Sequence, residues 1–338
     1  MNSELNQSNK ALVSTLWTNL ASAQSGDVAS AFAAAMADEV QWHGFAPIGS
    51  LVGVDALVEA YWQPLIDSFG EVRRETHVFF GGESNGRADG DIAKDGRSWV
   101  TGTGLFHGVF AEDYLGIPAN GEPVAIRWGE FCCVVDDQIT EVYLLLDLVD
   151  LMQQAGFDVL PPAQGADGRY PAPAAGDGVI DQPADADESA YSLDHIRRFI
   201  YDGLNAFDEG ELSSMGMVDW FDTDVRWYGP GGIGACLSFQ EFEELHQAPW
   251  LVAFPDRRVQ NLDAIIAEGS YSGAPGWAGV VATHTGPYLD QQATGKRIEF
   301  NGLDWWKRSG EKYIENWVFV DMVHLFDQLG VNLFESLR

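Results

Sequence analysis

The sequence DLVDLMQQAG at residues 147–156 returns, 174 positions later, as DMVHLFDQLG at residues 321–330, so both copies read D-x-V-x-L-x-x-Q-x-G. Each copy follows an apolar run that begins with glutamate, EVYLLL at 141–146 and ENWVFV at 315–320. Side chains in a strand alternate between two faces, so the first glutamate and the following aspartate of each run share a face. A carboxylate at the end of so apolar a strand is costly to bury without a partner or a chemical task.

Other matches show that this motif belongs to a longer repeat. VQWHG at residues 40–44 pairs with VRWYG at 225–229, and Arg73 pairs with Arg258, both at an offset of 185. Because the offset falls from 185 to 174 towards the end of each copy, the first copy carries eleven extra residues in its middle. Markers that occur in the same order in both halves predict a duplicated chain.

The duplication divides the chain into a first domain at residues 1–160, a linker at 161–190 and a second domain at 191–338. In the linker, 22 of 30 residues are Pro, Ala, Gly or Asp. Such a stretch buries too little apolar surface to offset its ordering entropy. We therefore predict a disordered-looking linker, which could also drape over one domain.

Helices are expected before the strands in each copy. The apolar spacing is helical at 9–24 and 193–208, where Ser192 offers an N-cap, and again at 54–68 and 239–252. The expected strands are 72–80, 97–110, 122–135 and 138–147, then 257–267, 276–289, 296–307 and 312–321. Helices followed by an antiparallel meander predict an α+β fold, a curled sheet against helices in the shape of a cone. The open end of such a cone is a common place for a small-molecule pocket.

Charge and cysteine content narrow the function classes. The chain has 51 acidic and 19 basic residues, a net charge of −32, which argues against nucleic acid and anionic membrane partners. The three cysteines (Cys132, Cys133, Cys236) suggest no disulfide framework, since adjacent cysteines rarely bridge. No apolar stretch reaches membrane-spanning length. We expect a reduced, cytoplasmic, soluble protein.

Several motifs of the second copy resemble a SnoaL-like polyketide cyclase domain, of the nuclear-transport-factor-2-like (ketosteroid-isomerase-like) cone fold. They are FPDR at 254–257, THTG at 283–286, TGK at 294–296 and the stretch from ENW to QLG at 315–330. The first copy fits more loosely. This fold hosts cyclases, isomerases, dehydratases, epoxide hydrolases and non-enzymatic binders, so the resemblance specifies a fold more than an activity.

The resemblance implies acid–base chemistry on a carbonyl compound without a cofactor. In the cyclases an Asp and a His in the cavity move protons, and by motif position these are Asp321 and His284. In the first copy Asp147 matches, and His107 lies within one residue of the His284 position, depending on the alignment of the glycines. His43 and Tyr228, which follow the shared Trp, could stabilise an enolate oxygen.

Each candidate also has a structural interpretation. Asp147 and Asp321 could cap the helix that the motif begins, alone or together with a catalytic role. The histidines could be satisfied structural residues, and Glu141 and Glu315 could pair with a nearby Arg or His. Aromatic residues could pack in the core or line a cavity for ring-shaped ligands. The candidate substrate-binding residues are Trp42, Glu141, Tyr143, Trp227, Trp305, Glu315 and Trp317.

A metal site in the first copy would need His43, His77, His107 and Asp147 to face one cavity. No H-x-H or H-x3-H spacing supports it, and the chain has no Walker loop, dinucleotide fingerprint or C-x-x-C. We therefore predict no metal and no cofactor.

The sequence thus favours a cofactor-independent enzyme of the cyclase, isomerase or lyase type, acting on a small hydrophobic carbonyl compound, with the second copy as the catalytic half. The alternative is a non-catalytic small-molecule binding module. The two copies are expected to form an internal pseudo-dimer through their sheets, and a homodimer of the whole chain stays open.

Overall fold

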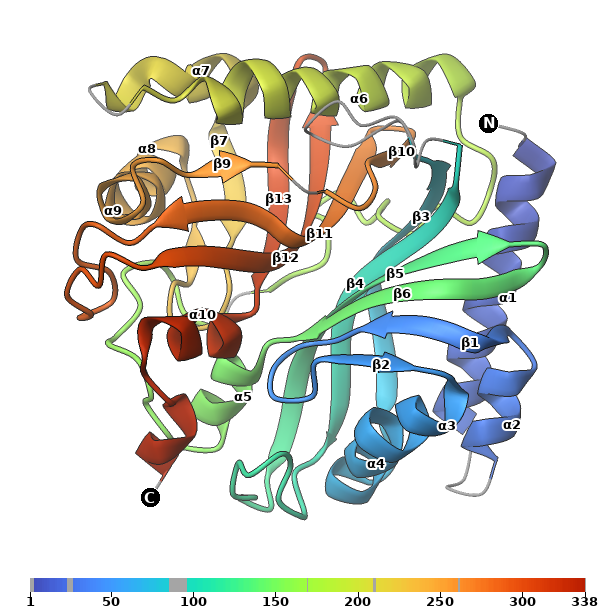
Figure 1. The fold of residues 1–338 in the computed structure, drawn as a ribbon. Coiled ribbons are helices and arrows are strands. Elements are labelled where there is room, and N and C mark those ends of the chain that lie inside the picture. Colours follow the sequence, from blue (N-terminus) through green and yellow to red (C-terminus); the bar gives the residue numbers. More distant parts are fainter. Residues whose placement is uncertain are drawn as a thin grey trace.

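The computed structural model describes residues 3–22, 27–84, 96–168, 170–208, 211–260 and 262–337. Figure 1 shows two halves side by side, each a curled sheet with helices against it. The first half contains α1 (Ser3–Ser22), α2 (Val28–Ala33), β1 (Met36–His43), β2 (Ser50–Val52), α3 (Val54–Leu57), a π-helical turn (Val58–Trp62), α4 (Gln63–Phe69), β3 (Arg73–Glu83), β4 (Ser98–Val109), β5 (Pro123–Val135), β6 (Gln138–Leu146) and α5 (Leu148–Gln154).

The second half repeats this order with more interruptions. It contains α6 (Ala186–Arg198), a π-helical turn (Phe199–Gly203), 3-10 turns (Leu204–Ala206, Leu212–Met215), α7 (Met217–Trp220), β7 (Phe221–Tyr228), β8 (Ala235–Cys236), α8 (Phe239–Glu241), a π-helical segment (Phe242–Gln247), α9 (Ala248–Ala253), β9 (Arg258–Val259), β10 (Ile266–Glu268), β11 (Tyr271–Thr283), β12 (Arg297–Ser309), β13 (Lys312–Val320), α10 (Met322–Leu329) and a 3-10 turn (Leu333–Leu337).

Both sheets are mixed and open. The six-stranded sheet has the order β2-β1-β6-β5-β4-β3, and the seven-stranded sheet has the order β10-β11-β12-β13-β7-β8 with β9 beside β11. The α+β class predicted from the sequence is confirmed. The expected antiparallel sheet needs a correction, because β1 runs parallel to β6 and β7 runs parallel to β13. The helices after β2 and β8 carry the chain to the far edge of each sheet, and the following strands return to pair with the first strand.

The structure gives the aspartate, glutamine and glycine of the repeated motif defined roles at the end of each half. Asp147 and Asp321 are the N-caps of α5 and α10, and the backbone continues at positive φ in the glycine after each helix. The glutamine between them connects each helix to a strand by hydrogen bonds, α5 to β5 and α10 to β12. Gln154 exchanges two hydrogen bonds with the backbone of Ala125, and Gln328 does the same with Glu299.

The helix that opens the second half begins earlier than predicted. Its N-cap is Asp185, whose side chain accepts a hydrogen bond of 2.9 Å from the backbone N–H of Glu188. Ser192 therefore lies inside α6, where its hydroxyl donates to the carbonyl of Gly269. The Pro-, Ala- and Asp-rich composition concealed a first turn whose acidic residues suit a helix N-terminus.

The segment between α5 and α6 makes backbone hydrogen bonds to both halves, rather than lying over one of them. Ala166 pairs with Ala235 of the second half through two bonds of 2.8 Å. Phe79 of the first half accepts from Ile180 and donates to Gly178. These bonds hold a chain of low hydrophobic content in place.

The two sheets contact each other face to face through β5 and β12. The indole of Trp305 stacks on Phe131 with ring centroids 5.1 Å apart, and its N–H donates to the hydroxyl of Thr101 at 2.9 Å. Each sheet is therefore buried on both faces, one against the other sheet and one against its own helices.

Candidate functional site

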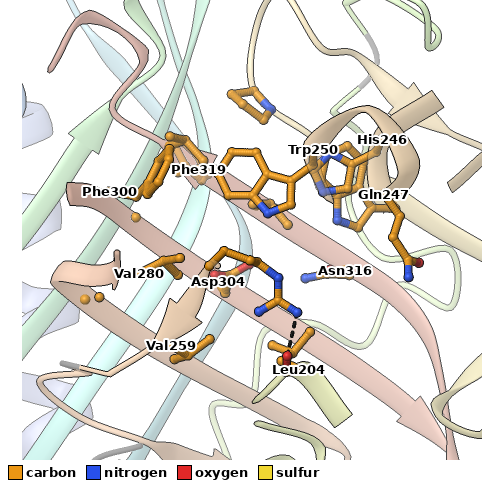
Figure 2. A pocket seen from close by; sticks show the side chains of 18 of the residues that line it. Leu204, His246, Gln247, Trp250, Val259, Val280, Phe300, Asp304, Asn316 and Phe319 are labelled. Atoms are coloured by element: carbon orange, nitrogen blue, oxygen red, sulfur yellow. Dashed lines mark hydrogen bonds between the residues drawn. The ribbon is translucent and has the colours of Figure 1, made fainter. Parts of the chain in front are cut away.

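The second half encloses a cavity of about 180 Å³ between its helices and the concave face of β11, β12 and β13. An apolar cavity of about 150 Å³ in another protein holds benzene, so this space suits a molecule, or part of one, of single-ring size. Figure 2 shows Asp304 and Asn316 on the strand side, with Trp250, His246 and Gln247 on the helix side. Most other lining side chains are aromatic or aliphatic.

Asp304 is the one carboxylate on the described wall of this cavity. It lies in the middle of β12, between Leu303 and Trp305, which point to the opposite face. Burial raises the pKa of Asp304 to about 7, although a hydrogen bond from Asn316 and the charge of Arg127 act in the other direction. The group is still partly exposed, to the cavity. A carboxyl group with a pKa near 7 can both take and return a proton at neutral pH.

Arg257, Gln247 and His246 are among the other polar residues that line the cavity. The guanidinium of Arg257 donates to the carbonyl of Leu204, the bond drawn in Figure 2, and burial lowers the pKa of Arg257 to about 10, so it stays charged at neutral pH. The side-chain oxygen of Gln247 is buried without a hydrogen-bond partner among the described residues. Burial, helped by the charge of Arg257, lowers the pKa of His246 to about 3, so its ring is neutral.

The first half fills the corresponding space with side chains. Glu130 forms an ion pair of 3.1 Å with Arg74, and both are almost completely buried. The Arg74 guanidinium also lies 4.3, 4.7 and 4.1 Å from the ring centroids of Trp17, Phe106 and Trp128. Stacking of this kind on a desolvated arginine is favourable.

The repeat offsets show which residues differ between the filled first half and the cavity of the second half. At the position of Glu130 it has Asp304, a shorter carboxylate. Arg74 and two of the aromatic residues that pack on its guanidinium are replaced by smaller residues, which line the cavity: Arg74 by Val259, Phe106 by Val280 and Trp128 by Gly302.

Of the residues predicted from the sequence, Trp227 lines the cavity, where its ring stacks on His246 at 4.0 Å. Tyr228, Trp305, Glu315 and Trp317 point to the other face of the second sheet. Trp317 donates to the carbonyl of Pro171, and Glu315 accepts from the backbone of Ala174, both in the linker. The alternation of side chains along the strands was predicted correctly. The face predicted to bind substrate, however, is the face of the second sheet that packs on the linker and the first half.

Asp147 and Asp321 are buried where the two halves meet, and Figure 1 shows α5 and α10 side by side there. Besides capping its own helix, Asp147 accepts a hydrogen bond of 2.8 Å from Gly231 N in the second half. Asp321 accepts one of 2.8 Å from Ala46 N in the first half. Burial raises the pKa of both. Neither lies on the cavity wall, and their predicted catalytic role stays a prediction.

His284 is fully buried outside the cavity lining. Its Nδ1 accepts from the backbone of Thr294 at 3.3 Å, its ring packs on Phe254, and burial lowers its pKa. The backbone of His284 pairs with Lys296 as Phe110 pairs with Glu122, so the first-half equivalent of His284 is Phe110 rather than a residue next to His107.

The remaining first-half candidates form separate groups rather than one site. His43 stacks on Tyr143 at 4.5 Å, and the Tyr143 hydroxyl donates to Glu141. Burial opposes ionisation of Glu141, but hydrogen bonds from His43, Tyr143 and Arg97 outweigh it and lower its pKa to about 2. His77 and His107 both contact Glu75, at 3.0 and 2.6 Å, and Trp42 packs on Tyr61 in the core.

Sequence reasoning missed most polar groups of the cavity. Asp304 carried the same signal as Asp321, a carboxylate within an apolar run, and its equivalence to Glu130 followed from the offset of 174. His246 and Gln247 lie in the segment predicted as a helix at 239–252, and no sequence pattern distinguished them. Arg257 ends the FPDR motif and begins the strand predicted at 257–267, but it was not chosen as a site residue.

Comparison with known families identifies the class. The SnoaL-like polyketide cyclase family matches residues 200–329, and the SnoaL-like domain family matches residues 19–142. The chain therefore belongs to the SnoaL-like families and carries two copies of their domain. None of the described helices is long and apolar enough to cross a membrane.

Solved structures similar to this chain include AclR, a proposed hydroxylase from Streptomyces galilaeus, at 24% identity and a TM-score of 0.35, covering 42% of this chain and 82% of AclR. IdmH, a proposed polyketide cyclase from Streptomyces antibioticus, is 20% identical with a TM-score of 0.33, covering 41% of this chain and 99% of IdmH. A proposed SnoaL-like polyketide cyclase from Jannaschia sp. is 17% identical with a TM-score of 0.34, covering 44% and 92%. No curated protein matches the chain.

Proposed function

We propose that the second half is a cofactor-independent acid–base catalyst that acts on a small hydrophobic carbonyl compound, and that Asp304 carries the proton. The observation that supports this most directly is a single carboxyl group, with its pKa raised to about 7, on the wall of an otherwise largely apolar cavity. Perturbed carboxyl groups in such places mark functional sites more often than chance.

The chemistry follows from the groups present. The Asp304 carboxylate takes a proton from the carbon next to the substrate carbonyl, and the electron pair of that C–H bond becomes the enolate. The negative charge collects on the carbonyl oxygen, where the Arg257 cation or the Gln247 amide can stabilise it. Protonated Asp304 then returns its proton to carbon or oxygen. Whether a new carbon–carbon bond, a shifted double bond or an elimination results depends on the substrate.

The alternative is a binding module whose cavity holds the same kind of ligand without turnover. An exchange reaction separates the two, because cyclases, isomerases and lyases of this type share abstraction of the α-proton. Wild-type protein incubated with acetophenone in D₂O is expected to speed incorporation of deuterium into the methyl group, measured by proton NMR, above the buffer rate.

Asp304→Asn keeps the shape of the side chain and removes the base, so it should lower the exchange rate by about 100-fold or more. Asp327→Asn, at an exposed position on α10, is the matched control and should exchange like wild type. Ligand binding without catalysed exchange in the wild type would favour the binding module.

A further inference from the structure

A second pocket, of about 410 Å³, lies at the surface against the outside of the cavity. One wall is the linker at residues 161–164, and another is the loop at 287–292. Ile233, His246 and Tyr288 line both this outer pocket and the cavity. The two spaces are therefore separated by a boundary of shared side chains rather than by a layer of backbone.

Two of the boundary residues have polar atoms available to a ligand. His246 is partly exposed, and its described contacts are the rings of Trp227, Phe242 and Trp250, with no hydrogen bond to its nitrogens among the described residues. The hydroxyl of Tyr288 likewise has no hydrogen bond within the described chain, although its ring packs on Phe254. Polar groups of this kind on the wall of a pocket normally bond to a ligand or to water.

We propose that the cavity and the outer pocket form one two-part binding site for an elongated ligand. Its carbonyl head occupies the cavity, and an uncharged apolar arm passes His246 and Tyr288 into the outer pocket. This inference rests on the proposed function for the position of the carbonyl head. It adds a substrate class, long carbonyl compounds rather than compact ones, and gives the linker a part in binding.

The residues that line the outer pocket favour an apolar arm without negative charge. Four prolines form part of its lining (Pro161, Pro162, Pro249, Pro287). Proline rings are rigid, so little conformational entropy is lost when an apolar arm packs on them. Asp290 at the rim, in a chain of net charge −32, disfavours an anionic arm.

The test compares two ketones that share a head, acetophenone and 4-hexylacetophenone, by isothermal titration calorimetry on the full chain. The wild type should bind the hexyl compound at least about 10-fold more tightly, because several methylenes leave water. Gln164→Trp places an indole in the outer pocket from an exposed position, and should bring the two affinities within about twofold without changing that for acetophenone. Asp327→Asn, at an exposed position outside the linings of both pockets, is the control and should keep the wild-type ratio.

Two more variants show which space holds the arm and which holds the head. Leu245→Trp obstructs the outer pocket from the π-helical segment Phe242–Gln247 and should act like Gln164→Trp. Val280→Phe fills the inner cavity and should weaken binding of both ketones. Equal affinities in the wild type, or tight binding of the hexyl compound to Val280→Phe, would overturn the two-part site. Failure of the proposed function has a different signature, an intact affinity ratio with no catalysed deuterium exchange.

Discussion

Glu130 and Asp304 occupy equivalent positions of β5 and β12, yet Glu130 is ion-paired with Arg74 at 3.1 Å while Asp304 faces a cavity. The two residues show two environments for a carboxylate in the middle of a buried strand. In the first half a neighbouring cation compensates the charge. In the second half the charge is left partly uncompensated, so the pKa of Asp304 rises to about 7 and the group becomes available for proton transfer.

Asp304→Asn should make the protein more stable at pH 8. Because burial raises the pKa of Asp304 from 3.8 to about 7, the folded chain binds more protons than the unfolded chain between these values, and stability falls as the pH rises through that window. Removing the group should raise the free energy of unfolding at pH 8 by about 1–4 kcal/mol.

Urea unfolding of the wild type and Asp304→Asn at pH 5 and pH 8 measures this effect. The gain should be smaller at pH 5, where folded Asp304 is already protonated. An Asn variant that is less stable at pH 8 would show that the ionised carboxylate is stabilised in the fold, and our account of the cavity would then be wrong.

Glu130→Gln should have the opposite effect. The substitution leaves the Arg74 cation buried among aromatic rings without its counter-ion, and breaking a buried ion pair from one side costs about 3–5 kcal/mol. The double variant Arg74→Leu with Glu130→Leu should recover much of the loss, because an apolar pair needs no compensation. Thermal unfolding measures whether the double variant is more stable than Glu130→Gln. Equal stabilities of the two variants would mean that the ion pair contributes only packing.

The sequence predicted the duplication, the α+β class and the end of each half, because these depend on local signals that occur twice. It left the role of Asp321 open between capping and catalysis, and the structure shows the capping bond directly. The face of each strand could not be predicted. Because side chains alternate along β12, Asp304 and Trp305 lie on opposite faces of the sheet. The face of Trp305 packs on the first sheet, and the face of Asp304 lines the cavity. Both faces are apolar, so the sequence contains no polar face that would identify the solvent side.

The cavity itself was also beyond local patterns. It exists because Val259, Val280 and Gly302 are smaller than their first-half equivalents, and a void depends on what three distant residues leave empty together. The offsets between the copies identify the three smaller residues, but only the three-dimensional structure shows that they line one cavity.

Asp321→Asn tests whether the motif aspartate is a cap or a proton carrier. Asn caps a helix about as well as Asp, but its single carbonyl oxygen cannot serve both His324 N and Ala46 N. One buried donor loses its acceptor, which should cost about 1–3 kcal/mol of unfolding free energy. Deuterium exchange by the folded variant should stay within about threefold of wild type, because Asp321 does not line the cavity in which we place the reaction.

The equivalent substitution Asp147→Asn is the matched control, because Gly231 N takes the place of Ala46 N there. Both variants should be destabilised and both should keep exchange. If Asp321→Asn instead lost exchange by about 100-fold, with its stability unchanged, the proton-transfer role would belong to Asp321 rather than to Asp304.

Val280→Phe should close the cavity without harming the fold. Val280 lines the cavity, as Figure 2 shows, and its first-half equivalent Phe106 already packs in the same kind of sheet. The added ring enters empty space, so the free energy of unfolding should change by less than about 1.5 kcal/mol, in contrast to the cost of overfilling a packed core. Ketone binding and deuterium exchange should both be lost, as measured by calorimetry and NMR. Val280→Ile, which adds one methylene, is the control and should keep both; exchange that persists in Val280→Phe would place the reaction outside this cavity.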